Sequence, residues 1–293
     1  MIVVFETRPG YVTLVRRCPH VDLVVEDCSL PAKLLQTMFK PKMSFRPLLP
    51  EERHPPQPRE RIHIIEEFRK SFGLKSLSEQ SARLNVSSRA LRQVGRRLRH
   101  EQMGGKPFAV IHTGPTWKVK EWPGKNWDNL VAGLKARNQI GIIQIGENRT
   151  ASGETRESPH VAGTINWVGT LTMDQTLALL SLANLFVGVD SGVLHLAGVM
   201  DAPCVGIFGP TDPMCFLPRN GHSVGVISNV SCLGCHHDSQ GPRHWQSGCA
   251  NNIRCMSELS VESVFDACGK LLRLRQPGLV PKKRASVKIT SAA

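Results

Sequence analysis

Short apolar runs alternate with longer amphipathic stretches through much of the chain. The apolar runs have the length and the branched residues of buried strands: Phe108–His112, Ile140–Ile145, Leu185–Val189 and Cys204–Phe208. A capping box, Thr172-x-x-Gln175, predicts a helix over Met173–Ala183, and Ser260 precedes a last stretch with helical spacing of apolar residues. Strands that alternate with helices in this way predict a parallel sheet of the α/β class.

Two stretches interrupt this pattern and divide the chain. Residues 48–61 are rich in proline and charge but lie inside the first half, so they predict a long loop. Gly104-Gly105-Lys106-Pro107 is the better domain boundary. We therefore expect a first domain over residues 1–105, a second over 106–275 and a disordered basic tail over 276–293.

The most informative segment joins the strand Leu185–Val189 to the helix after it. Asp190-Ser191-Gly192 forms a tight polar turn, and the helix begins near Val193. The first N–H groups of a helix lack intrahelical acceptors and lie at the positive end of its dipole, so they favour an anion. Gly192 lets a ligand approach the backbone, and His195 adds a donor. The segment predicts a diphosphate site; a cap at Asp190 and a buried structural His195 are the alternative.

Two further loops favour the diphosphate site, because parallel strands place their C-terminal loops along one edge of a sheet. One, Gly209-Pro210-Thr211-Asp212-Pro213, follows the next strand; the other, residues 113–123, follows the first strand of the second domain. The latter carries Lys118 and Lys120, and lysine is a point charge suited to phosphate. Solvated lysines and a packing role for Trp122-Pro123 are the alternative, but three loops together favour a ligand.

With these loops the chain resembles glycosyltransferase family 9, the heptosyltransferase-like glycosyltransferases. The motifs that carry the resemblance are Lys120-x-Trp122-Pro123, Asp190-Ser191-Gly192-x-x-His195-Leu196-Ala197 and Phe208-Gly209-Pro210-Thr211-x-Pro213. They occur in that family's order and cover residues 106–270. The resemblance implies a GT-B-like α/β fold of two Rossmann-like domains with parallel sheets, the first on the acceptor side and the second binding a nucleotide-sugar donor.

The resemblance also implies how the donor, a nucleotide-diphosphate sugar such as ADP-heptose, is held. The residues it assigns to the diphosphate are Lys120, Asp190, Ser191, Gly192 and His195, with Thr116 as a further candidate. Family members hold the ribose with an acidic residue after the next strand. Glu147, in Gly146-Glu147-Asn148, is the carboxylate nearest to that position.

The first half lacks the loop that supplies the family's catalytic base. Members open with a strand and a Gly-x-Gly-Asp loop, whereas this chain opens with Met1–Phe5 and Glu6-Thr7-Arg8-Pro9-Gly10. Residues 19–25 correspond to a later strand of the family, so we expect the N-terminal domain to be incomplete. Inverting transfer needs a base for the acceptor proton. We assign none, because Asp22 and Asp27 fit strand ends and turns.

The chain is basic, with a formal net charge of +13 and a pI near 9.6. Part of this charge lies on a predicted helix with an apolar stripe of Leu91, Val94 and Leu98; its arginines are Arg89, Arg92, Arg96, Arg97 and Arg99. A solvated basic face is the simpler interpretation, and peripheral contact with an anionic membrane is the functional one. No nucleic-acid partner is expected, because aromatic residues do not interleave with the basic ones. No apolar run of about 18 residues and no secretory leader occur, so we expect a cytoplasmic protein.

Four cysteines have spacings that suit a metal, Cys232-x2-Cys235-x13-Cys249-x5-Cys255. Their thiolates could close a tetrahedral structural zinc site, with His236, His237 and His244 as spare ligands. Reduced cysteines without metal are the alternative, and disulfides are disfavoured in a reducing cytoplasm. No cofactor is expected for catalysis, because the chain has no Asp-x-Asp pair to hold a divalent ion on the diphosphate.

The resemblance implies an inverting, metal-independent glycosyltransferase. It would move a sugar such as heptose to a lipopolysaccharide-core-like or other cell-surface glycan, on a glycolipid or lipid-linked acceptor. A catalytically impaired nucleotide-sugar-binding remnant is the alternative. A serine hydrolase using Ser191 and His195 fails on spacing, because a nucleophile elbow needs Gly-x-Ser-x-Gly. A zinc-containing nucleic-acid binder leaves the three loops unexplained.

Overall fold

The computed structural model describes residues 4–7, 11–26, 29, 33, 61–71, 83–114, 117–148, 158–237, 249–274 and 288–291. Asp27, Thr116, His244 and residues 48–60 of the expected long loop lie outside these ranges. Within them, no helix is long and apolar enough to cross a membrane.

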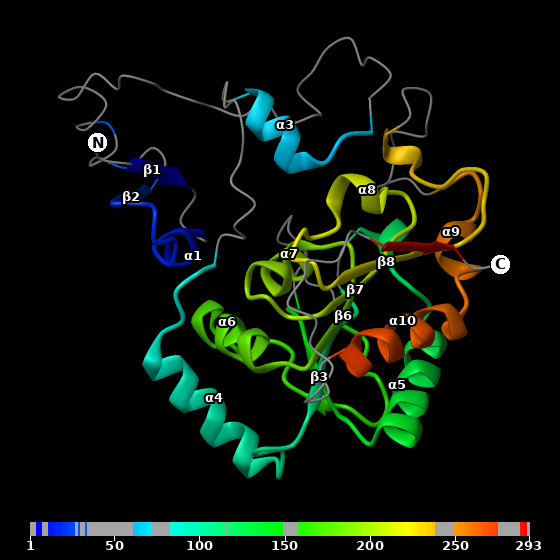
Figure 1. The fold of residues 1–293 in the computed structure, drawn as a ribbon, viewed down its shortest axis with the longest axis horizontal. Coiled ribbons are helices and arrows are strands. Elements are labelled where there is room, and N and C mark those ends of the chain that lie inside the picture. Colours follow the sequence, from blue (N-terminus) through cyan, green and yellow to red (C-terminus); the bar gives the residue numbers. More distant parts are fainter. Residues whose placement is uncertain are drawn as a thin grey trace.

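A seven-stranded parallel sheet forms the centre of the molecule (Figure 1). In chain order its strands are β3 (Phe108–His112), β4 (Gly141–Ile145), β5 (Ile165–Asn166), β6 (Leu185–Val189), β7 (Cys204–Ile207), β8 (Ser223–Ile227) and β9 (Lys288–Ser291). Their spatial order is β5-β4-β3-β6-β7-β8-β9, and each neighbouring pair is parallel. The four strands expected from the apolar runs are confirmed, as is the α/β class.

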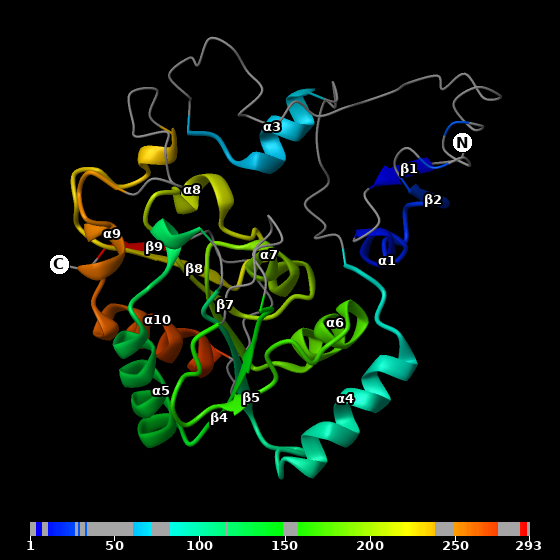
Figure 2. The same ribbon diagram turned by 180° about the vertical axis from the view of Figure 1, so that it is seen from behind.

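Helices cover both faces of this sheet, as the two opposite views show (Figures 1 and 2). On one face α5 (Gly124–Asn138) packs against α10 (Val261–Leu274). On the other lie α4 (Ser88–His100), α6 (Met173–Leu182) and α7 (Gly192–Val199). The expected capping box of α6 is confirmed, because Thr172 and Gln175 exchange side-chain and backbone hydrogen bonds. Four short helices lie in the connections: η3 (Lys118–Lys120), α8 (Pro213–Phe216), η4 (Cys235–His237) and α9 (Arg254–Ser257).

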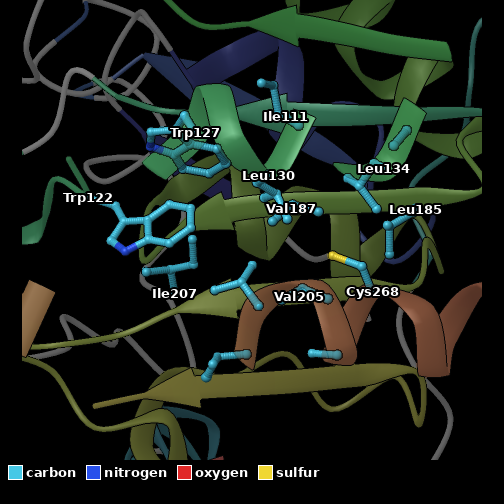
Figure 3. Close-up of a cluster of buried hydrophobic side chains, with 14 of the residues drawn as sticks. Ile111, Trp122, Trp127, Leu130, Leu134, Leu185, Val187, Val205, Ile207 and Cys268 are labelled. Atoms are coloured by element: carbon cyan, nitrogen blue, oxygen red, sulfur yellow. The ribbon is translucent and has the colours of Figure 1, made fainter. Parts of the chain in front are cut away.

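Strand and helix side chains interleave in the core under α5 and α10 (Figure 3). Trp122 is 3% exposed and meets Trp127 edge to face, with ring centroids 5.2 Å apart. The Trp122 indole N–H also donates to the Leu259 carbonyl at 3.0 Å. This packing confirms the structural role considered for Trp122, and it anchors the loop that carries Lys120.

Three glycines lie side by side across the middle of the sheet. Gly188 of β6 pairs with Gly206 of β7, which pairs with Gly225 of β8. A Cβ at any of them would approach a neighbouring side chain too closely: Phe186 at 2.7 Å, Phe208 at 2.6 Å and Pro213 at 2.6 Å, respectively. The bare backbone of this row leaves the space that the aromatic rings and α8 fill.

The N-terminal residues form a separate β-α-β unit. β1 (Val4–Thr7) and β2 (Leu23–Glu26) pair in parallel, and α1 (Val12–Val15) connects them. The Arg17 guanidinium makes a bidentate contact with the Asp174 carboxylate at the start of α6. Farther along, α3 (Ile64–Ser71) lies near α8 (Figures 1 and 2).

The structure differs from two expectations about the parts of the chain. α4 precedes the expected boundary at residues 104–107, yet it packs against α6 of the second domain because Ala90, Val94 and Leu98 are buried there. Leu91, expected in that stripe, is only half-buried. Within the expected disordered tail, Lys288–Ser291 forms β9, which pairs in parallel with β8.

Candidate functional site

The candidate site lies along the edge of the sheet where the parallel strands end. Glu147 follows β4, and Asp190 follows β6. His112 is the last residue of β3, and Lys120 lies in the loop after it. Thr211 follows β7. Because the strands are parallel and adjacent, their order fixes the order of these loops along one edge.

The N-terminus of α7 presents free backbone donors at this edge. Ser191 is its N-cap residue, but its side chain caps no helix N–H. The amides of Leu194 and His195 bond to the Ser191 carbonyl, while those of Gly192 and Val193 have no acceptor among the described residues. A Cβ atom added at Gly192 would have no other described heavy atom within 4 Å, so the space in front of this backbone is open. These donors therefore have room for an anion.

Asp190 binds side chains and does not cap α7. Its Oδ2 lies 2.7 Å from Lys120 Nζ and accepts a hydrogen bond from Thr211 Oγ1 at 2.8 Å. Burial opposes ionisation of this carboxyl, but the Lys120 charge and the two hydrogen bonds outweigh it and lower the pKa of Asp190. The interpretation of Asp190 as a helix cap is therefore wrong, and its ionised carboxylate holds Lys120 at the edge of the site.

His195 lies on the first turn of α7 and is half-buried. Burial lowers the pKa of His195; the Asp190 carboxylate opposes this shift and the Lys120 ammonium adds to it. With its pKa below the ordinary value of 6.5, the ring is mainly neutral near pH 7. A neutral imidazole can still donate one N–H to an anion.

Sequence reasoning missed His112 at the end of β3. Its Nδ1 lies 3.3 Å from Ser191 Oγ, and burial lowers the pKa of His112 to about 4. The Ser191 hydroxyl therefore pairs with a neutral His112, and not with His195 as a hydrolase dyad would require. The available signal was a polar residue ending an otherwise apolar strand, directly before the loop that carries Lys120.

Residues of the first half also reach this edge, although no local pattern in the chain predicts it. Arg61 Nη1 lies 2.9 Å from Asp212 Oδ2, although the two residues are 151 positions apart. His63 Nε2 donates to the Leu217 carbonyl at 2.9 Å, and its Nδ1 accepts from the Ile65 amide at 3.3 Å. Because both ring nitrogens are engaged, His63 serves packing and is no free base.

Glu147 lies at the same edge, one strand beyond Lys120. Its side chain is exposed, and the preceding Gly146 has φ of +157°. A Cβ on Gly146 would lie 2.8 Å from the Gly114 carbonyl, so the loops after β3 and β4 touch here. The structure brings Glu147 to this edge, and among the described residues no hydrogen bond or ion pair joins its side chain to Lys120, Asp190 or His195.

The four spaced cysteines come near one another in the described part of the chain, and none of them forms a disulfide there. Burial raises the pKa of Cys255 to about 12, with smaller contributions from the thiols of Cys235, Cys232 and Cys249. Across the described ranges, no group of three His, Cys, Asp or Glu side chains is arranged to hold a metal ion. The tetrahedral zinc site expected from the spacing therefore stays a prediction, since the spare ligand His244 lies outside the described residues.

Comparison with known proteins agrees with these motifs. The sequence model of Glycosyltransferase family 9 (heptosyltransferase) matches residues 48–245. Lipopolysaccharide heptosyltransferase 1 of Pseudomonas aeruginosa is 32% identical over 134 residues, which cover 45% of this chain and 37% of that protein. The corresponding enzyme of Escherichia coli K12 is 31% identical over 145 residues, or 43% of this chain and 44% of that protein. The chain therefore spans less than half the length of these relatives.

Solved structures share the fold at low identity. A glycosyl transferase family 9 protein from Veillonella parvula superposes with a TM-score of 0.66 at 15% identity, covering 93% of this chain and 88% of that one. E. coli ADP-heptose LPS heptosyltransferase II superposes with a TM-score of 0.61 at 14% identity, covering 93% of this chain and 89% of that one. The third structure is a dodecameric iron-containing heptosyltransferase of E. coli, solved with ADP-D-beta-D-heptose. It superposes with a TM-score of 0.61 at 20% identity, covering 94% of this chain and 78% of that one. This likeness confirms the expected GT-B-like architecture.

Proposed function

Because the chain belongs to glycosyltransferase family 9, we propose that it transfers a sugar from a nucleotide-diphosphate donor to a glycan acceptor. The observation that carries the proposal is the start of α7. There, the amides of Gly192 and Val193, which have no acceptor among the described residues, lie in the same turn as His195, and the Asp190 carboxylate holds Lys120 beside that turn. A diphosphate is the ligand that this set of donors suits best.

The same donors would assist the bond-breaking step. Glycosyl transfer proceeds through an oxocarbenium-like transition state, so negative charge grows on the leaving diphosphate. Donors fixed before the reaction stabilise that charge without reorganising. We assign this role to Lys120 and the α7 amides, with His195 donating an N–H. Asp190 would act as a positioning residue for Lys120, because a buried carboxylate is a poor ligand for an anion.

We further propose that transfer inverts the anomeric configuration and needs no metal. The chain has no Asp-x-Asp pair to hold a divalent ion, and Lys120 already supplies a positive charge beside the diphosphate position. We assign no catalytic base for the acceptor hydroxyl. Ser191 completes the proposed diphosphate site, oriented by His112.

For the donor, we propose a nucleotide with its ribose at Glu147 and, by analogy with the relatives, ADP-heptose. Glu147 follows β4, the neighbour of β3, so a nucleoside would extend from the diphosphate toward that end of the edge. For the acceptor, we propose a glycolipid of the lipopolysaccharide-core type, as the relatives' names suggest. Such an acceptor implies work in the cytoplasm with peripheral contact at a membrane, for which α4 offers exposed arginines.

Calorimetric titration of the purified chain with ADP, UDP and GDP tests the proposal. We expect saturable binding of one nucleotide, and a loss of about 1–3 kcal/mol of binding free energy in His195→Ala, because a hydrogen bond to a charged group is removed. His222→Ala, an exposed histidine at the opposite end of the sheet, is the matched control and should bind normally.

Absence of binding by the wild-type chain, or equal loss in both variants, would contradict the diphosphate site. Binding without transfer of heptose from ADP-heptose to a lipopolysaccharide-core acceptor would instead favour a nucleotide-sugar-binding remnant.

A further inference from the structure

Four aromatic side chains gather beside Lys120 at the end of the site away from Glu147. They are Trp117, Phe216, His236 and His237, here called the aromatic set. His236 lies with its ring centroid 6.2 Å from Trp117, 6.5 Å from Phe216 and 5.2 Å from His237. The set comes from three separate connections of the sheet, those after β3, β7 and β8.

The backbone holds these segments against one another. The His236 amide donates to the Pro210 carbonyl at 2.8 Å, and the Gly234 amide donates to the Gly209 carbonyl at 2.9 Å. The connection after β8 is thereby fixed to the loop after β7, directly before Thr211. The aromatic set is therefore part of the same edge as the diphosphate donors.

Trp117 connects the aromatic set to the diphosphate donors. Lys120 Nζ lies 4.5 Å from the centre of the Trp117 ring and 2.7 Å from Asp190. Although tryptophan is highly buried on average, the Trp117 side chain stays 44% exposed. A large ring that is held by neighbours and still open to solvent is suited to stack on a ligand.

The strand order places three members of the aromatic set, Phe216, His236 and His237, on the side of the diphosphate away from Glu147. The diphosphate donors lie at β3 and β6, in the middle of the edge, and the proposed ribose residue Glu147 lies at β4. The ends of β7 and β8 lie on the opposite side of the diphosphate. A donor that extends its nucleoside toward β4 must extend its other substituent, the sugar, toward the aromatic set.

We infer that the aromatic set, with Trp117 as its exposed ring, binds the transferred sugar of the donor through the sugar's C–H face. This inference rests on the proposed function and adds the part of the site that recognises the sugar. One face of a pyranose ring presents C–H bonds, which pack on the negative face of an indole. The hydroxyl groups on its rim can meet the partly exposed imidazole of His236. His237 is buried, and its Nε2 accepts a hydrogen bond from the Asp212 amide at 3.1 Å, so it supports His236 from behind.

The test compares two ligands that differ only in the sugar, ADP and ADP-heptose, titrated into the wild type and into Trp117→Ala. We expect the variant to bind ADP as the wild type does, within twofold, and to bind ADP-heptose about fivefold more weakly, the value of one aromatic contact. Trp117→Phe, which keeps an aromatic face, should recover most of that loss. Tyr11→Ala removes another exposed aromatic ring, in the N-terminal unit, and should change neither affinity.

Equal weakening of both ligands would overturn the inference, because the ring would then stack on the nucleobase. Unchanged affinity for both would also overturn it. Thermal melting curves of the variants confirm that they fold. Failure of the proposed function has a different signature, since the wild-type chain would then bind neither ADP nor ADP-heptose.

Discussion

Lys120 and Asp190 show what one buried carboxylate does for an anion site. Lys120 comes from a loop, where a long side chain would otherwise sample many rotamers. The Asp190 carboxylate holds its ammonium group at 2.7 Å, and the centre of the Trp117 ring lies 4.5 Å from the same group. The lysine therefore reaches the site in an ordered position, but part of its charge is already neutralised.

Asp190→Asn should destabilise the fold, because it leaves the Lys120 ammonium largely buried without its counterion. We expect the free energy of unfolding to fall by about 3 kcal/mol, as for other broken buried pairs. Urea unfolding measures this value. In Asp190→Asn/Lys120→Met, with both charges removed, much of the lost stability should return.

If instead the two substitutions add their separate costs, the pair is not coupled and Asp190 does not position Lys120. Asp174→Asn, which breaks an ion pair of half-buried partners with Arg17, is the control and should cost less than about 1 kcal/mol.

Single residues of the site were predictable where a local motif marks them. Ser191, Gly192 and His195 follow from the turn before a helix, and Lys120 from its loop; the structure brings them together at one edge. His112 and Thr211 were missed as site residues, because their roles depend on which strands lie side by side. A sequence read along the chain does not contain that pairing.

At the scale of elements, α4 shows two faces with opposite chemistry. Ala90, Val94 and Leu98 bury one face against the sheet. Of the arginines on this helix, Arg97 stacks over Trp167 at 4.0 Å and also donates to Thr170. The others are exposed and form no salt bridge with a described carboxylate: Arg89, Arg92, Arg96 and Arg99. Their spacing of three, four and three residues sets them along one stripe of the helix.

Replacing all four stripe arginines by glutamine should weaken binding to anionic vesicles by at least about tenfold, because each basic residue near such a surface contributes about 1 kcal/mol. Co-sedimentation with phosphatidylglycerol vesicles measures the effect, and phosphatidylcholine vesicles should bind neither protein.

The charge-matched control replaces four exposed basic residues on the opposite face of the sheet: Lys125, Lys135, Lys270 and Arg273. Equal losses in both quadruple variants would mean that net charge alone attracts the protein, and that α4 forms no membrane-contacting face.

At the scale of the whole molecule, buried histidines link stability to pH. Burial is the main cause that lowers the pKa of His63, His112 and His195. A histidine with a lowered folded-state pKa stabilises the fold fully above its unfolded value of 6.5, and this contribution is lost as pH falls toward the folded value. The carboxyl groups with lowered pKa, Asp190 and Glu66, stay ionised over this interval.

Because the pKa of His112 in the fold is about 4, this residue alone should lower the free energy of unfolding by about 2 kcal/mol when the pH falls from 7 to 5. Urea unfolding at the two pH values measures the loss. His112→Gln should show a visibly smaller pH dependence, whatever its absolute stability. An unchanged pH dependence in this variant would mean that His112 is not held neutral in the fold.

Much of the sheet was predictable because its central strands are buried on both faces and therefore appear as continuous apolar runs. The division of the chain into domains was less predictable. Gly104–Pro107 does form a turn, but α4 before it belongs by packing to the second domain. Contacts such as Arg61 with Asp212 join residues that are 151 positions apart, and no local pattern announces them.

The glycine row across β6, β7 and β8 also has a genetic meaning. Any missense change of a glycine codon adds at least a Cβ, and at Gly188, Gly206 or Gly225 that atom would lie within 2.7 Å of a neighbour's side chain. Two of these strands lead directly into the loops of Asp190 and Thr211. Random mutagenesis should therefore return heat-sensitive alleles at these codons, with folding and ligand binding lost together at the restrictive temperature.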